Sequence, residues 1–97
     1  VIAGVGLNPD DIMTCDVPTY AVDLSIALDH LTLTAVEKGL GTCWIGAFNQ
    51  EKVKEILGIP DKYKVVSIMP LGYPADSPRP KDRKDFDQVV CFDKFEE

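Results

Sequence analysis

The stretch that decides the fold joins an apolar helical pattern to the start of a second helix, and it reads Lys38-Gly39-Leu40-Gly41-Thr42-Cys43-Trp44-Ile45-Gly46-Ala47-Phe48. The helical pattern stops at Gly39, a residue type that commonly ends helices in the left-handed conformation. Gly46 and Ala47 carry no side chain or only a methyl group, so a flat ligand could approach the main chain closely there. The stretch is therefore either a ligand-contacting turn or only a connection between two helices.

The residues before this stretch predict a long helix with more than one apolar side. Neither glycine nor proline occurs from Tyr20 to Lys38. Apolar residues recur there at helical spacing and form a stripe of Leu24, Ala27 or Leu28, Leu31 and Ala35. Ile26 and Leu33 lie away from that stripe, so a second side of the helix is also apolar. Such a helix is usually central in a fold or covered by a second chain.

The other segments complete a prediction of the α+β class. Asn49 is a good helix N-cap, and the apolar spacing after it predicts a short helix that ends at Gly58. Three segments rich in β-forming residues predict strands, namely Val1–Val5, Tyr63–Met69 and Val89–Phe92. Pro70 predicts either a strand edge or a break at the end of the second of them. Because the chain opens inside a strand pattern and without an initiator methionine, we expect it to be part of a longer protein.

Composition sets limits on the class of protein and on its partners. A chain of 97 residues, 45% of them hydrophobic and 27% charged, has the ordinary make-up of one small globular domain. Its net charge of −6 argues against nucleic acid and against an anionic membrane surface as partners. No apolar run approaches the roughly 20 residues that a transmembrane helix needs.

Three smaller features favour structural over functional interpretations. The chain has three cysteines, Cys15, Cys43 and Cys91. Their number is odd and their spacing matches neither a zinc site nor a disulfide framework, which predicts small buried thiols in a reducing cytoplasm. His30 is the single histidine, so no metal site is expected and its imidazole is interpreted as packed or at the surface. Gly4-Val5-Gly6 could begin a dinucleotide-binding fingerprint, but no helical pattern follows at once, which favours glycines at a strand end.

A concentration of positive charge late in the chain is the second candidate site. The cationic segment, Pro78–Lys84, contains Arg79, Lys81, Arg83 and Lys84. An arginine fork together with a lysine point charge matches a phosphate, whereas Asp82 within the segment is equally compatible with a solvated loop. A ligand with a flat ring and a phosphate would engage both this segment and the small-residue turn. Flavin mononucleotide, FMN, has that shape.

Three pieces of the sequence resemble the FMN-dependent nitroreductase family. They are Leu24–Phe48 with its Gly-Leu-Gly-Thr-Cys-Trp-Ile-Gly motif, the strand and turn Val65–Pro74, and the cationic segment. The resemblance implies a nitroreductase-like mixed sheet flanked by helices, with residues 1–97 forming the C-terminal portion of a single FMN-binding domain. It also implies that FMN lies at the interface of an intertwined homodimer. The family's N-terminal phosphate-binding motif has no counterpart here.

The same resemblance implies roles for individual residues. Those that would contact the flavin are Trp44, Ile45, Gly46 and Ala47 at the ring, and Lys81 and Arg83 at the phosphate. The backbone amide of Gly46 or Ala47 would donate to flavin N5, the atom that accepts hydride. No side chain is assigned as a catalytic acid or base. The C-terminal stretch, residues 86–95, is expected to reach across the partner subunit.

The implied activity is that of an NAD(P)H oxidoreductase. NAD(P)H would reduce FMN and leave, and a small-molecule acceptor such as a nitroaromatic or a quinone would then take the electrons in the same pocket. Two alternatives stay open. One is different flavin chemistry on the same fold, such as reductive dehalogenation or flavin breakdown, and the other is a non-catalytic flavin-binding module.

Overall fold

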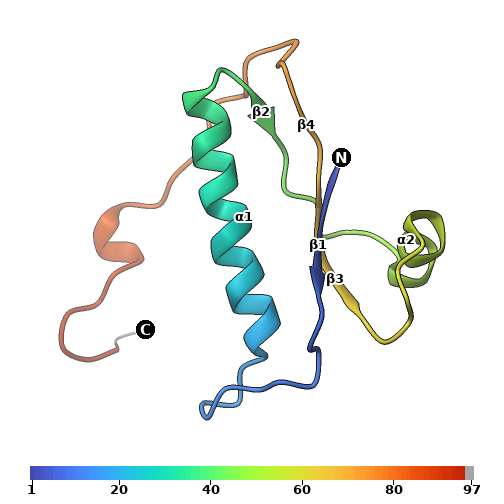
Figure 1. Cartoon of the computed structure of the whole chain (residues 1–97). Coiled ribbons are helices and arrows are strands. Elements are labelled where there is room, and N and C mark those ends of the chain that lie inside the picture. Colours follow the sequence, from blue (N-terminus) through green and yellow to red (C-terminus); the bar gives the residue numbers. More distant parts are fainter. Residues whose placement is uncertain (96–97) are drawn as a thin grey trace.

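The computed structural model describes residues 1–95 and has a helix on either side of a small set of strands (Figure 1). In chain order the elements are β1 (Ile2–Gly6), α1 (Thr19–Glu37), β2 (Gly41–Thr42), α2 (Gln50–Leu57), β3 (Lys64–Met69), β4 (Leu71–Gly72) and the 3-10 helix η1 (Phe86–Gln88). The long helix α1 contacts β1, β2 and β3, whereas α2 contacts β3. The α+β class is confirmed, and no described helix is long and apolar enough to cross a membrane.

The strands form two antiparallel pairs. β1 pairs with β3 from Ile2 opposite Met69 to Gly6 opposite Lys64, with a shift of register between Gly4 and Val5. β2 pairs with β4, so the chain turns from one pair into the other at Pro70, the break that the sequence predicted. Among residues 1–95 every strand pairing is antiparallel, so the parallel neighbours that a mixed sheet requires are not among these pairs.

Both helix ends predicted around the small-residue turn are confirmed. Gly39 follows α1 with a φ of +73°, the left-handed region that glycine adopts without steric penalty. Asn49 caps α2, because its side-chain oxygen accepts a hydrogen bond of 3.0 Å from the amide of Lys52. At the other end of α2, the buried Lys54 donates from Nζ to the carbonyl of Asp61 at 3.0 Å and ties the helix to the turn before β3.

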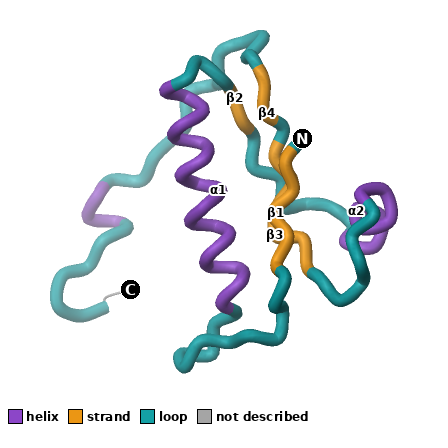
Figure 2. The backbone as a smooth tube through the Cα atoms, viewed as in Figure 1, coloured by secondary structure: helices purple, strands orange, loops and turns teal. Residues whose placement is uncertain are grey.

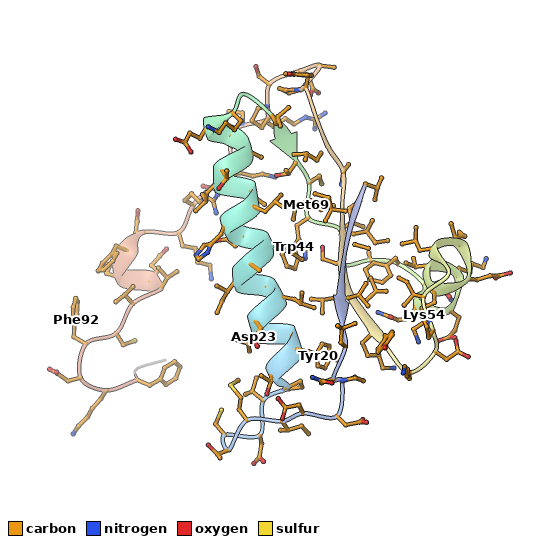
Figure 3. The ribbon with its side chains drawn as sticks, in the orientation of Figure 1. Tyr20, Asp23, Trp44, Lys54, Met69 and Phe92 are labelled. Atoms are coloured by element: carbon orange, nitrogen blue, oxygen red, sulfur yellow. The ribbon has the colours of Figure 1, made fainter. Side chains whose placement is uncertain are left out.

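Two glycines of β1 allow α1 to lie close against the strand. A Cβ on Gly4 would come within 2.8 Å of Leu28 Cδ1, and one on Gly6 within 2.5 Å of Tyr20 Cδ2. Tyr20 is in the first turn of α1, beside the end of β1 (Figure 3). The glycines therefore serve helix–strand packing, in agreement with the structural interpretation of Gly4-Val5-Gly6.

The core of this chain is small, and much apolar surface faces outward. The Cα radius of gyration is 16.6 Å, compared with about 12–13 Å for a compact domain of this length. The buried hydrophobic residues are Leu28 and Ala35 of α1 and Val65 and Met69 of β3. The other side of α1 is uncovered, with Leu33 64% and Val36 71% exposed. The second apolar side of the helix, expected from the sequence, is therefore present.

Two expectations are wrong. Residues 89–92 form no strand, because the segment that follows η1 has no strand beside it within residues 1–95. Figure 2 shows this segment as η1 flanked by loop, on the far side of α1 from the strands. The cysteines are also not buried. Cys15, Cys43 and Cys91 are all exposed, since each is in a loop or turn rather than in the α1–β3 core.

Candidate functional site

The candidate site is a short loop that β3 holds at its first end through backbone pairing. We call residues 46–49 the arch. Just before it, Ile45 donates from its amide to the carbonyl of Ile68 at 3.0 Å and accepts from the amide of Ile68 at 3.1 Å. The hydroxyl of Ser67 donates to the same Ile45 carbonyl at 3.1 Å. Ile45 therefore behaves as a one-residue extension of the sheet on the edge of β3 away from β1.

At its second end the arch is held by a side chain. Gln50, the first residue of α2, directs its carboxamide at the backbone of Val65. Its Oε1 accepts from the Val65 amide at 3.1 Å, and its Nε2 donates to the Val65 carbonyl at 2.5 Å. The carboxamide reproduces the donor and acceptor pair of a neighbouring strand. Both ends of the arch therefore rest on one strand edge.

The register shift in the β1–β3 pair explains how one edge can hold both ends. In a regular antiparallel strand, backbone groups that point to the same side recur at even spacing. Val65 and Ile68 are three positions apart in the sequence, yet both direct their backbone N–H and C=O groups away from β1. The irregularity between Gly4 and Val5 of β1, opposite Val66, supplies the extra residue that this odd spacing requires.

The arch itself presents accessible backbone donors. Gly46 and Ala47 are exposed, and their amide nitrogens make no hydrogen bond within residues 1–95. A Cβ built on Gly46 would meet only Trp44 Nε1, at 3.8 Å, so the space beside the glycine is open. The Trp44 side chain is 44% exposed, and Figure 3 shows where it lies relative to α1 and the strands. Free amides beside an accessible aromatic ring can bind the polar edge of a flat ligand.

The cationic segment is accessible but is not beside the arch. Pro78–Lys84 is exposed throughout, and Lys54–Glu51 is the ion pair found within residues 1–95, so Lys81 and Arg83 have no carboxylate partner there. The segment leaves β4, passes the C-terminal end of α1 and continues to η1, whereas the arch leads to α2 (Figure 1). The four predicted ring contacts are consecutive in the chain, and the two predicted phosphate contacts lie on a separate segment. Their joint role remains a prediction.

Two residues of the site were not predicted from the sequence. Gln50 falls only within the short helix predicted after Asn49, and Ser67 only within the strand predicted at Tyr63–Met69. Their hydrogen bonds cross 15 and 22 residues of sequence, so no local pattern indicates them. The described residues also contain no group of three or more His, Cys, Asp or Glu side chains that could hold a metal ion.

Comparison with known proteins then identifies the family. The model of the nitroreductase family matches residues 16–73, which include α1, the arch and β3. The chain belongs to the nitroreductase family. The resemblance seen in the sequence is confirmed, although the match ends before the cationic segment, so Lys81 and Arg83 lie outside the matched part of this nitroreductase-family chain.

Relatives and solved structures agree with this assignment. A provisionally named NADH dehydrogenase/NAD(P)H nitroreductase from Methanothermobacter thermautotrophicus is 34% identical over an aligned length of 88 residues, and the match covers 80% of this chain and 46% of the relative. The crystal structure of a nitroreductase family protein from Clostridium novyi NT has 44% identity and a TM-score of 0.67, covering 74% of this chain and 41% of that one. The NADPH:FMN oxidoreductase from Vibrio harveyi, complexed with NAD+, has 34% identity and a TM-score of 0.73, covering 80% and 35%.

These coverages show how much of the family domain the chain represents. It spans less than half the length of each of these proteins. The superpositions confirm the nitroreductase-like α+β fold for that part.

Proposed function

We propose that the protein to which this chain belongs is an FMN-dependent NAD(P)H oxidoreductase of the nitroreductase type. The observation that carries the proposal is the arch, on which the unbonded amides of Gly46 and Ala47 are exposed beside Trp44 and are fixed to β3 at both ends. Backbone donors held in this way suit an acceptor atom at the edge of a flat ring. FMN, when bound, supplies the chemistry of accepting a hydride at N5 and passing the electrons to a second substrate.

The residues of this chain would bind and orient that group. The amide of Gly46 or Ala47 would donate to N5, and the backbone of Trp44 and Ile45 would line the ring. Donation to N5 stabilises negative charge that develops at the ring, because the fixed dipole needs no reorganisation. The exposed guanidinium of Arg83 and ammonium of Lys81 would hold the phosphate by charge-assisted hydrogen bonds. No side chain of the arch is required to move a proton.

Names of relatives support the electron donor and the cofactor. A protein from Staphylococcus aureus that is 33% identical over 79 residues is named an NADPH-dependent oxidoreductase. The Vibrio harveyi neighbour is named an NADPH:FMN oxidoreductase. We propose by extension that NAD(P)H binds first and leaves, and that a small acceptor such as a nitroaromatic or a quinone follows it in the same pocket.

We further propose that the protein is a homodimer. Apolar side chains on two separate surfaces are uncovered in this chain: Leu33 and Val36 on α1, and Phe92 and Phe95 in the C-terminal segment, the latter two 77% and 83% exposed. Phe92 lies far from the strands, on the other side of α1 (Figure 3). Exposed apolar area of this kind is typical of surfaces that another chain covers. A second copy would cover α1 and receive residues 86–95.

The test combines flavin binding with turnover. The full-length protein should bind FMN in a fluorescence titration and oxidise NAD(P)H with a nitroaromatic or a quinone as acceptor. Arg83→Ala should weaken FMN binding by about 1.5–3 kcal/mol, the contribution of a hydrogen bond to a charged group. Lys62→Ala, which removes an exposed cation outside the cationic segment, should bind FMN normally.

Each result has a distinct meaning. Unchanged FMN affinity in Arg83→Ala would remove the phosphate assignment and leave the ring assignment intact. Bound FMN without turnover of any acceptor would show a flavin-binding module, and turnover only of halogenated phenols would show reductive dehalogenation. A protein that ignores added FMN would refute the proposal.

A further inference from the structure

We infer that Gln50 and Ser67 are positioning residues that hold the arch so that the amides of Gly46 and Ala47 face the flavin ring. The inference rests on the proposed function. Neither side chain would touch the flavin; both act through the backbone of residues 45–50. The evidence is that the two side chains secure opposite ends of the arch to one edge of β3.

Gln50 makes the stronger of the two connections. Its carboxamide uses both its acceptor and one of its donors on a single residue, Val65, which is 3% exposed. Two hydrogen bonds to the N–H and C=O of one residue fix the side chain in position and in orientation. Because Gln50 is the first residue of α2, the same contact fixes the start of that helix directly after the arch.

Ser67 restrains the other end of the arch, at Ile45. Its side chain is fully buried, and its hydroxyl donates to the Ile45 carbonyl at 3.1 Å. That carbonyl already accepts from the Ile68 amide, so it receives two donors. A second donor on one carbonyl limits the rotation of the Ile45–Gly46 peptide unit, whose nitrogen is the first of the two free amides.

The chain between these points is longer than the distance that it must cross along β3. Val65 and Ile68 are about 10 Å apart along β3, at roughly 3.3 Å per residue. The five peptide steps from Ile45 to Gln50 could span up to about 17 Å when extended. Residues 46–49 therefore have more length than the span along β3 requires. The two connections limit how freely this slack segment can move relative to β3.

Loss of one connection should reduce flavin binding without removing any flavin contact. With the Gln50 end released, the arch would occupy its binding geometry only part of the time, and apparent affinity falls in proportion to that fraction. Both hydrogen bonds go to the backbone of the buried Val65, and only part of their stabilisation biases the arch toward its binding geometry, so we expect FMN affinity to fall about three- to tenfold.

The experiment compares Gln50→Met with Glu55→Gln in the full-length protein. Methionine keeps the length and volume of glutamine but removes both hydrogen bonds, whereas Glu55 is an exposed residue of the same helix. FMN affinity is measured by fluorescence titration, and loss of the Gln50–Val65 contact is measured by hydrogen exchange at the Val65 amide. We expect faster exchange at Val65 and FMN binding about three- to tenfold weaker in Gln50→Met, with neither change in Glu55→Gln.

A second variant covers the case in which Gln50→Met does not fold. Ser67→Ala removes only the hydroxyl and leaves the Ile45 carbonyl bonded to the Ile68 amide, so no buried acceptor is left unpaired. It should weaken FMN binding about two- to fivefold, corresponding to one neutral hydrogen bond.

The outcomes separate this inference from the proposed function. If Val65 exchanges faster in Gln50→Met while both variants bind FMN as tightly as the wild type, the side chains are merely structural and the inference is overturned. If the wild-type protein does not bind FMN, the proposed function fails and the inference falls with it.

Discussion

Replacing Gly6 with alanine tests the close contact between α1 and β1 that shapes this half of the fold. The new Cβ would lie 2.5 Å from Tyr20 Cδ2, 2.9 Å from Cγ and 3.0 Å from Cβ. Rotation of the tyrosine ring can relieve the first contact but not the last, because Cβ is fixed to the helix backbone. The first turn of α1 must therefore move away from β1 by several tenths of an ångström.

The size of the effect follows from two opposing terms. Overpacking at a site that cannot relax costs typically 1–3 kcal/mol, so we take about 2 kcal/mol. Alanine also reduces the conformational freedom of the unfolded chain, which returns about 0.4–1 kcal/mol. The net loss of about 1–2 kcal/mol should lower the melting temperature by roughly 5–15 °C for a domain of this size.

Two further glycines provide controls for this prediction. Gly4→Ala meets the mobile end of a side chain, Leu28 Cδ1, at 2.8 Å, so it should destabilise by less than Gly6→Ala. Gly72→Ala meets nothing within 4 Å and should be neutral or slightly stabilising. Thermal unfolding followed by circular dichroism measures all three. Equal melting temperatures for Gly6→Ala and Gly72→Ala would show that α1 does not approach β1 as closely as described.

Two other substitutions test the helix ends that flank the small-residue turn. Asn49→Ala removes the cap on the Lys52 amide and should cost about 1 kcal/mol, whereas Asn49→Asp should retain most of the stability; equal urea midpoints for the two variants would contradict the cap. Gly39→Ala must adopt a φ of +73° with no neighbour within 4 Å, so its cost of about 1–2 kcal/mol is purely conformational. Gly39→Asn should restore part of that loss, and an alanine variant as stable as the wild type would refute the left-handed assignment.

Much of the fold could be predicted because its signals are local. The end of α1 at Gly39 and the start of α2 at Asn49 depend on residues within one helical turn. The break at Pro70 is equally local, since proline cannot supply a ladder hydrogen bond. The failed prediction of a strand at residues 89–92 has the opposite cause. β-forming residues make a strand only where a second edge is available, and none lies beside this segment within residues 1–95.

For the candidate site, too, some features follow from local sequence and others only from the tertiary structure. The sequence by itself determined the small residues of the turn and the family they indicate. Tertiary structure alone decided that Ile45 and Gln50 would meet one edge of β3, because hydrogen bonds across 15 and 22 residues depend on the path of the whole chain. It also decided that a carboxamide would take the place of a strand at Val65. A local pattern can specify which residues are small enough to receive a ligand, but only the assembled sheet edge can hold them in place.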